Sequence, residues 1–492
     1  MILRFPFMIC LVVLFQSVFA NDFDFTPNLQ KAYFEVFKLK LPTSQKLIAA
    51  EKPSNPFKIY LSNYIDMIEV LNSDSEAAYE RFVNKEGKRL EFIEQLNQNS
   101  PYNRFLRAEV KMQLAVVKIK FGNEVKAAWN IVQAARLLEE NQKLFPNFVP
   151  QLKSLGCLHI LIGSIPENYN WVIKLLGIKG NIKQGVEELK LAGKDEIWGL
   201  EASLISFFLQ EYLLKFGERE NVNLLKVLEN HPDCLSFYII AVSILLKTGQ
   251  ADQSAFLLKK YSFGEEYPTF PILDLYKADV HLYRGDYLSA GREYAHFLEN
   301  FKGSTYLKET YFKLFLCYWL TGEESKATQI LSKIPVVGKT ISEADKAAEK
   351  FYENYTKTHQ LPNKSLLQIR LATDGGYYEK AARLATNLSE KALITLKEKV
   401  EYNFRVGRIF QKNNQPEKAI EHFKRAIRLN EKENWHFGAS SSLQIGYIYQ
   451  LKGQRPLAKD FFNQAISYKK HEYKNTIDGK ARAALTEMGY ID

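Results

Sequence analysis

The sequence predicts an all-α fold built as a solenoid, a continuous stack of helical hairpins, and three observations support this prediction. After residue 28, nearly every stretch places apolar residues at three- and four-residue spacing without sustained alternation, which indicates amphipathic helices rather than strands. Glycine and proline lie mainly between these stretches. One pattern also occurs twice between Glu401 and Tyr468. With 492 residues, the chain is long enough for one continuous core without separate globular domains.

The repeated pattern combines small residues with large aromatic ones at fixed spacing. In both copies, steps of twelve and four residues separate a glycine, an alanine and a phenylalanine. The small residues allow two antiparallel helices to approach closely, and the aromatic rings fill the space beside them. A single hairpin of this kind cannot bury its apolar face alone, so neighbours must stack on both sides. The residues expected in the core of the two copies are Gly407, Phe410, Ala419, Phe423, Gly446, Tyr449, Ala458 and Phe462.

This pattern resembles the tetratricopeptide repeat (TPR), which pairs a first helix containing Gly-x-x-Tyr with a second containing Ala-x-x-x-Phe. The resemblance implies a right-handed superhelical solenoid whose concave groove binds other proteins. Weaker copies precede the two strong ones. Their turn glycines, Gly249, Gly285 and Gly322, lie 36 and 37 residues apart, slightly more than the roughly 34 residues of the standard repeat.

Residues 1–20 have the layout of a secretory signal peptide. Arg4 supplies a positive charge, Phe5 to Phe15 is almost wholly apolar, and Val18-Phe19-Ala20 ends in a small residue. The alternative is a membrane anchor, but the apolar run is shorter than the ~20 residues that a span needs. No cysteine stands where a bacterial lipoprotein would carry its anchor. We therefore expect an exported, soluble protein in a periplasm or outside the cell, with no later transmembrane segment.

Residues 151–195 interrupt the repeat pattern with several glycines. Gly163-Ser164-Ile165-Pro166 and Leu176-Gly177-Ile178-Lys179-Gly180-Asn181 resemble the insert of the Iml-type inclusion-body-clearance TPR family, which implies a shared overall architecture. The signal peptide departs from the cytosolic setting of that family, so its location and partners are not carried over. The expected organisation is a signal peptide (1–20), N-terminal helical hairpins (21–150), the helical insert (151–195), TPR-like repeats (196–335), a polar connection (336–364) and C-terminal TPR repeats (365–492).

Charge and cysteine usage indicate ordinary helix surfaces and a reduced core. The net charge of +10 comes from 66 basic and 56 acidic residues that are interspersed. Solvated helix faces explain this better than nucleic-acid binding, which would also conflict with export. Three cysteines follow the signal peptide at wide spacing, and we expect buried free thiols, with one disulfide as the alternative. They are Cys157, Cys234 and Cys317.

No motif indicates catalysis, a metal or a cofactor. Gly338-Lys339-Thr340 looks like the end of a phosphate-binding loop, but Lys333 stands where the motif needs another glycine. The eight histidines show no metal-ligand spacing, and paired acids such as Glu323-Glu324 lie at helix starts, where they favour the helix dipole. We therefore expect a protein without enzymatic activity.

By analogy with the TPR, the first helix of each unit lines the concave groove. This analogy predicts Arg408, Lys412, Tyr447, Gln450, Phe312 and Trp319 as partner-binding residues, because aromatic and arginine side chains anchor interfaces. The alternative is that these side chains pack against the neighbouring helix. The predicted function is an exported scaffold for an unidentified protein partner. A glycan-binding surface protein on the same scaffold is the alternative, and a hydrolase or lyase would need a cluster of acids or histidines that the sequence does not display.

Overall fold

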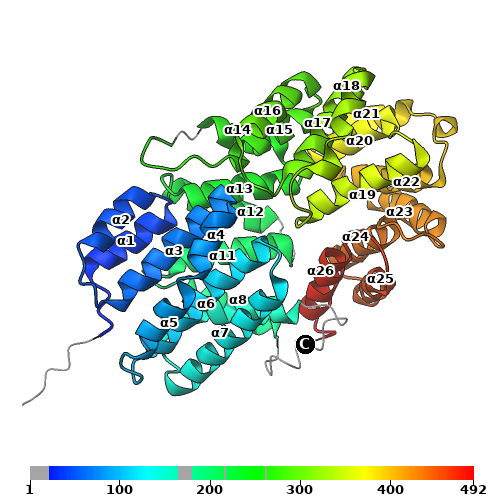
Figure 1. The fold of residues 1–492 in the computed structure, drawn as a ribbon. Helices are drawn as coiled ribbons and strands as arrows, with labels where there is room; N and C mark the ends of the chain where they lie inside the picture. The colour runs from blue at the N-terminus through cyan, green and yellow to red at the C-terminus, as the bar shows by residue number, and fades with distance from the viewer. Residues whose placement is uncertain (1–21, 165–179, 215–217, 261–262, 492) are drawn as a thin grey trace, which may run out of the picture.

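The computed structural model describes residues 22–164, 180–214, 218–260 and 263–491. Within these ranges all regular elements are helices, and consecutive antiparallel pairs stack into a curved solenoid (Figure 1). The predicted all-α solenoid of helical hairpins is therefore confirmed. The predicted signal peptide and most of the glycine-rich motif around Gly177 lie outside the described residues.

Several helices of the N-terminal part begin with a side-chain cap. The Thr26 side chain accepts a hydrogen bond from the Leu29 N–H at the start of the first helix, and Asn55 does the same for Phe57 at the start of the third. In both cases proline follows the cap, where its missing N–H costs nothing. The helices are α1 (Pro27–Phe37), α2 (Leu41–Ala49), α3 (Pro56–Ser73), α4 (Glu76–Val83), α5 (Glu86–Glu94), α6 (Pro101–Lys120) and α7 (Glu124–Leu144).

The middle part contains the insert and the weaker repeats. A short 3-10 turn, η1 (Val149–Gln151), leads into the insert. Two glycines bring the insert helices α8 and α10 into backbone contact, because a Cβ atom at Gly156 would lie 2.7 Å from the Gly185 carbonyl oxygen. The helices are α8 (Leu152–Gly163), α10 (Ile182–Ala192), α11 (Gly199–Tyr212), α12 (Glu218–Asn230), α13 (Leu235–Lys247), α14 (Ala251–Lys260), α15 (Ile272–Arg284), α16 (Tyr287–Asn300), α17 (Leu307–Thr321) and α18 (Glu324–Leu331).

The C-terminal part contains the two strong copies of the pattern. Their second-helix alanines and phenylalanines are fully buried, and a Cβ atom at Gly407 would lie 2.7 Å from the Phe423 ring. The α-helices are α19 (Glu343–Thr358), α20 (Lys364–Asp374), α21 (Tyr378–Asn387), α22 (Leu396–Lys412), α23 (Pro416–Leu429), α24 (Phe437–Leu451), α25 (Arg455–Ser467) and α26 (Lys474–Glu487). Two 3-10 turns, η3 (Ile334–Val336) and η4 (Glu390–Ala392), lie between them.

Residues 336–364, expected to form a polar connection, contain the helix α19. The Ser342 side chain caps its start by accepting from the Asp345 N–H. The Phe351 ring then packs against two rings of α17, with centroids 4.8 Å from Phe312 and 5.6 Å from Phe315. This segment therefore packs along α17 as part of the solenoid.

A buried ionic network stabilises the N-terminal half. The Lys153 side chain is 1% exposed and contacts the Glu109 carboxylate, and its ammonium lies 3.3 Å from Glu201. Burial alone would lower the pKa of Lys153, but these two carboxylates raise it above its ordinary value. The Tyr33 hydroxyl donates a hydrogen bond to Glu201, and the lysine ammonium also lies 5.5 Å from the Trp198 ring centroid. Each charge thus has partners that compensate for its removal from water.

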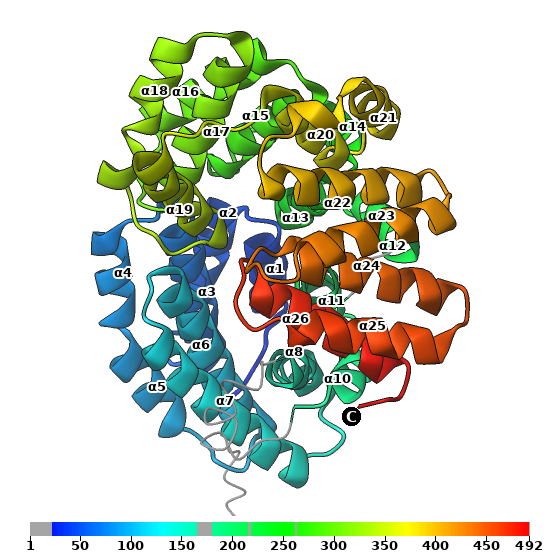
Figure 2. The same cartoon turned by 90° about the vertical axis from the view of Figure 1, so that its right-hand side faces the viewer.

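The solenoid also makes contacts between segments that are far apart in the sequence. Asp74 accepts hydrogen bonds of 2.6 Å from the backbone N–H groups of Ser304 and Thr305, which joins α3 to the start of α17. At the other end, Ala483 of α26 packs in one apolar cluster with Leu189 of α10 and Leu209 of α11. Figure 2 shows α26 close to α10, in agreement with the contacts between these two helices. The two sides of the superhelix therefore meet.

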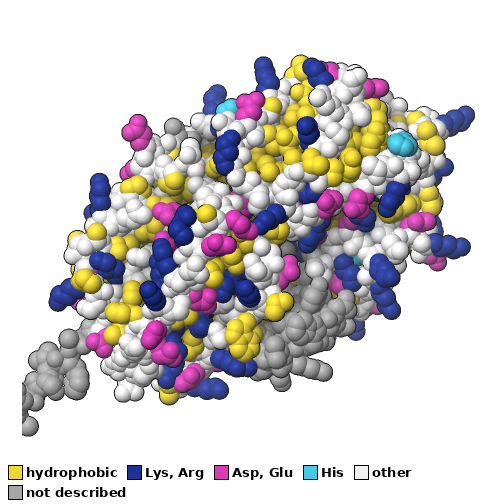
Figure 3. All heavy atoms as spheres, in the orientation of Figure 1, with side chains coloured by type: hydrophobic (Ala, Val, Ile, Leu, Met, Phe, Trp, Pro, Cys, Tyr) yellow, Lys and Arg dark blue, Asp and Glu magenta, His cyan; other side chains and the backbone are white. Residues whose placement is uncertain are grey.

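The remaining sequence expectations concern the surface, the membrane and the thiols. On the face in Figure 3, basic and acidic side chains are intermixed. Across the described ranges, no helix is long and apolar enough to cross a bilayer. The three cysteines carry free thiols, and burial raises the pKa of each. This outcome agrees with the free-thiol expectation and not with the disulfide alternative.

Candidate functional site

Two adjoining depressions run along α19 and together form what we call the α19 groove. Their volumes are about 350 Å³ and about 230 Å³. One wall comes from α17 and α19, and the other comes from α20, α22 and the start of α24. Both depressions are lined by Phe351, Asn354, Arg370, Lys397 and Glu401.

Aromatic side chains hold the larger depression in shape. The Phe437 ring lies 5.7 Å from Phe404 and 4.2 Å from the His436 ring, and His436 in turn meets Tyr473 edge-on at 5.2 Å. Phe312 lies on the opposite wall, packed against Phe351. Aromatic rings of this kind provide large rigid contact area for a bound segment.

The charged groups of the α19 groove are arranged in pairs. Arg405 lies 2.7 Å from Asp374 and 3.5 Å from Glu401, and Lys350 lies 2.7 Å from Glu472. A hydrogen bond with His436 and the nearby Lys350 lower the pKa of Glu472 well below its ordinary range, against the opposing effect of burial. Burial lowers the pKa of His436. At neutral pH the groove therefore presents a carboxylate at Glu472 beside a neutral imidazole.

A second, polar cavity of about 240 Å³ lies behind the groove, and we call it the Arg408 pocket. It is formed by the end of α13, by α15, by the turn between α20 and α21, and by α22. Asp374 and Arg405 line both this pocket and the groove. The full lining is Leu246, Lys247, Thr248, Gly249, Tyr283, Thr373, Asp374, Tyr378, Phe404, Arg405 and Arg408.

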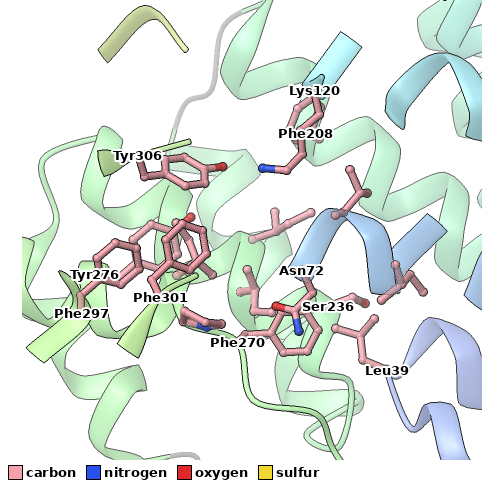
Figure 4. A pocket seen from close by; sticks show the side chains of 16 residues that line it. Leu39, Asn72, Lys120, Phe208, Ser236, Phe270, Tyr276, Phe297, Phe301 and Tyr306 are labelled. Carbon is pink, nitrogen blue, oxygen red and sulfur yellow. The ribbon is translucent and has the colours of Figure 1, made fainter. Parts of the chain in front are cut away.

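A third cavity is apolar and has a volume of about 420 Å³. Figure 4 shows Tyr276, Phe297 and Phe301 on one side and Phe208 near Lys120 on another. The Lys120 ammonium lies 3.3 Å from the Asp74 carboxylate, donates to the Thr305 hydroxyl and lies 5.0 Å from the Tyr306 ring centroid. Its charge is therefore already engaged by the protein.

The structure divides the six predicted partner-binding residues among different surroundings. Arg408 lines its pocket, and Lys412 is exposed one helical turn further along α22. Phe312 lines the α19 groove. Trp319 donates a 2.9 Å hydrogen bond to the Pro362 carbonyl, and the Lys364 ammonium lies 4.1 Å from its ring centroid, so the chain itself packs against this side chain.

The other two predicted residues lie on α24 and face the C-terminal helices. The Tyr447 ring packs edge-on against Phe462 with centroids 5.3 Å apart, and Gln450 donates a 2.9 Å hydrogen bond to Glu487 of α26. The six residues therefore do not form one continuous line. Sequence reasoning also missed Lys247 and Phe351, because the contacts that place them at the cavities come from elements distant in the chain.

Comparison with known proteins assigns part of the chain to a repeat family and finds several similar solved structures. No curated protein matches the sequence. Among solved structures, the human IFIT1 dimer with PPP-AAAA matches with 13% identity, 91% coverage of this chain, 94% of that chain and a TM-score of 0.30. The APC/C hetero-tetramer Cut9-Hcn1 matches with 13% identity, 90% coverage of this chain, 90% of that chain and a TM-score of 0.28. The P58(IPK) TPR domain matches with 13% identity, 86% coverage of this chain, 99% of that chain and a TM-score of 0.21. The tetratricopeptide repeat family model matches residues 400–433 and 439–472. The two copies of the repeated pattern are therefore tetratricopeptide repeats, as the spacing of their small and aromatic residues predicts.

Proposed function

We propose that this protein is a non-catalytic scaffold that binds an extended or helical segment of a protein partner in the α19 groove. Proteins with TPR repeats generally mediate protein–protein interaction. The observation that carries the proposal is the groove itself, in which aromatic rings from α17, α19 and α24 surround a depression rimmed by charged side chains. Such a surface offers apolar anchor sites and polar partners for a peptide backbone.

The charged groups of the groove favour binding rather than catalysis. Asp374 and Glu472 form ion pairs with neighbouring arginine or lysine side chains, and both pairs lie at 2.7 Å. Carboxylates engaged in this way hold the walls of the groove in place. Lys350 is more than half exposed, so it can also contact a bound segment.

The proposal includes export from the cytoplasm. It rests on the layout of residues 1–20, with a positive start, an apolar run and a small residue at its end. A bacterial periplasm is the simplest compartment for a soluble scaffold that enters the secretory route. N-terminal sequencing of the protein purified from its source tests this point, and a chain that begins at Asn21 is the expected result.

Site-specific photocrosslinking tests the groove as the binding surface. A photoreactive amino acid in place of the exposed Asn354 lies within the groove, and the same group in place of the exposed Lys424 lies on α23 outside it. Crosslinking in the cell envelope is expected to capture a defined protein at position 354 and not at position 424. Identical products from both positions, or none at position 354, would contradict the proposal. Crosslinking to glycan alone at position 354 would favour the glycan-binding alternative.

A further inference from the structure

The walls of the Arg408 pocket are fixed by backbone contacts between distant turns. The turn after α13 meets the turn after α20, where the Ala251 N–H donates a 3.2 Å hydrogen bond to the Gly375 carbonyl. At Gly376, where φ is +86°, an added Cβ atom would lie only 1.9 Å from the Gly249 carbonyl oxygen. Only glycine allows this approach. The pocket is therefore shaped before any ligand enters it.

The acidic groups near the pocket are already matched by cations. Asp374 lies 2.7 Å from Arg405 and 3.6 Å from Arg370, and Arg405 also lies 3.5 Å from Glu401. Two arginines thus balance two carboxylates. What remains in the pocket is the positive charge of Arg408 and Lys247.

Neither of the two remaining cations forms an ion pair at contact distance within the described part of the chain. Arg408 is half-buried and bonds to the neutral Tyr378 hydroxyl, while the nearby Asp374 and Arg405 act on it with opposite charges. Lys247 lies with its ammonium 3.4 Å from the Tyr212 ring centroid, and its charge opposes the larger effect of burial, which raises the pKa of the nearby Glu211. The exposed Lys247 keeps most of its hydration, whereas the half-buried Arg408 loses part of its hydration without forming an ion pair.

Further cations approach from the neighbouring helices and repel this charge. Burial lowers the pKa of Lys480 on α26; Glu211 opposes this as the next-largest influence, and the charges of Lys247 and Arg408 add to the lowering. Lys412 is exposed at the surface, but partial desolvation and the charge of Arg408 lower its pKa. Cations from α13 and α22 therefore line the cavity, and Lys480 of α26 lies close enough to repel them, at a cost in stability that an anion would relieve.

We infer that the Arg408 pocket is a binding site for the phosphate group of a small ligand. The Arg408 guanidinium offers a planar fork of donors that matches phosphate oxygens, and Lys247 adds a point charge. The Tyr378 hydroxyl lines the same cavity and adds a further donor. The hydroxyls of Thr248 and Thr373 also line it, but they donate to the Ile244 and Ile369 carbonyls of their own helices. The lining holds Lys247, Arg405 and Arg408 against Asp374, a surplus of two cations. This surplus suits a group carrying close to two negative charges better than a single carboxylate.

The volume of the pocket sets the size of the ligand. At about 240 Å³ it is smaller than the roughly 300–1,000 Å³ cavities that hold drug-sized molecules. A phosphate or diphosphate group fits this description, with the rest of a phosphorylated molecule extending toward the solvent. Arg408 and Lys247 line this pocket and not the α19 groove, so the inference stands whether or not a protein segment binds in the groove.

Calorimetric titration of the full chain with pyrophosphate and with inorganic phosphate, in chloride buffer, tests the assignment. One equivalent of pyrophosphate is expected to bind, and the variants Arg408→Gln and Lys247→Gln are expected to weaken binding at least about tenfold each. Lys247 is exposed and its replacement leaves the core intact. Lys424→Gln removes the same charge from the exposed face of α23 and is expected to bind like the wild type.

Parallel titrations distinguish the source of the phosphate group and the outcomes that overturn the inference. Tighter binding of glucose 6-phosphate or of a phosphoserine peptide than of pyrophosphate would support the site and identify the ligand class. Failure of the wild type to bind any of these phosphates would overturn it. So would equal weakening by all three variants, citrate binding as tight as pyrophosphate binding, or binding of a long oligonucleotide without binding of pyrophosphate.

Discussion

Replacing Gly407 by alanine adds one methyl group at the contact between the two helices of the first strong repeat. The new Cβ atom would lie 2.7 Å from both Cδ1 and Cε1 of Phe423 and 3.1 Å from its Cγ. These atoms belong to the rigid ring of a fully buried side chain, which also packs against Phe404 at 6.0 Å. The ring cannot turn away without disturbing the core, so the helices must separate.

The expected cost follows from two opposing effects. Forcing an extra methyl group into a packed core costs about 1–3 kcal/mol. Replacing glycine by alanine inside a helix gains about 1 kcal/mol from helix propensity. Gly291 in α16 isolates the second effect, because the nearest atoms to its added Cβ lie at 3.6 Å and 3.8 Å, an ordinary contact distance. Gly407→Ala should therefore be less stable than Gly291→Ala by about 1–3 kcal/mol.

Equilibrium urea unfolding of the two variants and the wild type measures this difference. Gly291→Ala is expected to raise the unfolding midpoint, whereas Gly407→Ala is expected to leave it unchanged or lower it. Similar slopes across the three proteins would show that the transitions can be compared. If both variants were stabilised to the same extent, the close approach of the helices at Gly407 would not be what fixes the geometry of the repeat.

Three further predictions concern the buried charges and thiols. Lys153→Met should lower the free energy of unfolding by about 3–5 kcal/mol in a urea titration, because it leaves two buried carboxylates without their counter-ion; an unchanged midpoint would contradict this role. Glu472 has a depressed pKa in the folded protein, so its contribution to stability is present above its unfolded value of about 4.3 and is lost as the pH falls. Glu472→Gln should therefore flatten the dependence of the melting temperature on pH below about pH 5, and a variant as acid-sensitive as the wild type would argue against this. At pH 8 the thiols of Cys157, Cys234 and Cys317 should resist iodoacetamide in the native protein and react in urea, because burial raises their pKa values. Mass spectrometry measures the alkylation at each cysteine, and rapid alkylation in the native protein would refute this prediction for the residue concerned.

The sequence was sufficient to predict the fold because the repeats are encoded locally. A glycine, an alanine and a phenylalanine within seventeen residues, such as those from Gly407 to Phe423, specify both helices of a hairpin and their contact. The glycines at the turns, such as Gly285 with φ of +90°, mark the ends of first helices in the same local way. Stacking then follows from the apolar faces that each hairpin leaves uncovered.

The candidate sites were only partly predictable because they depend on contacts between distant parts of the chain. Arg408 was expected on the concave face, but nothing near it in sequence indicates that Lys247 lines the same cavity. The polar composition of residues 336–364 suggested a connection, whereas the apolar face of α19 finds its partners on α17 and η3. Trp319 was predicted to bind a partner, but its hydrogen-bond acceptor is the Pro362 carbonyl, a residue distant in the chain.

The contact of α26 with α10 and α11 changes how the array responds to mechanical or thermal stress. In an open repeat protein each unit is supported only by its neighbours, so a terminal unit can detach while the rest stays folded. Here Ala483 is also held in the cluster that contains Leu189 and Leu209, so detaching the last helix requires opening a seam with the insert. Opening that seam would also withdraw Lys480 from the surroundings of Arg408. A change that disrupts the contact of α26 with α10 and α11 should therefore alter both the cooperativity of unfolding and the electrostatic field inside the superhelix.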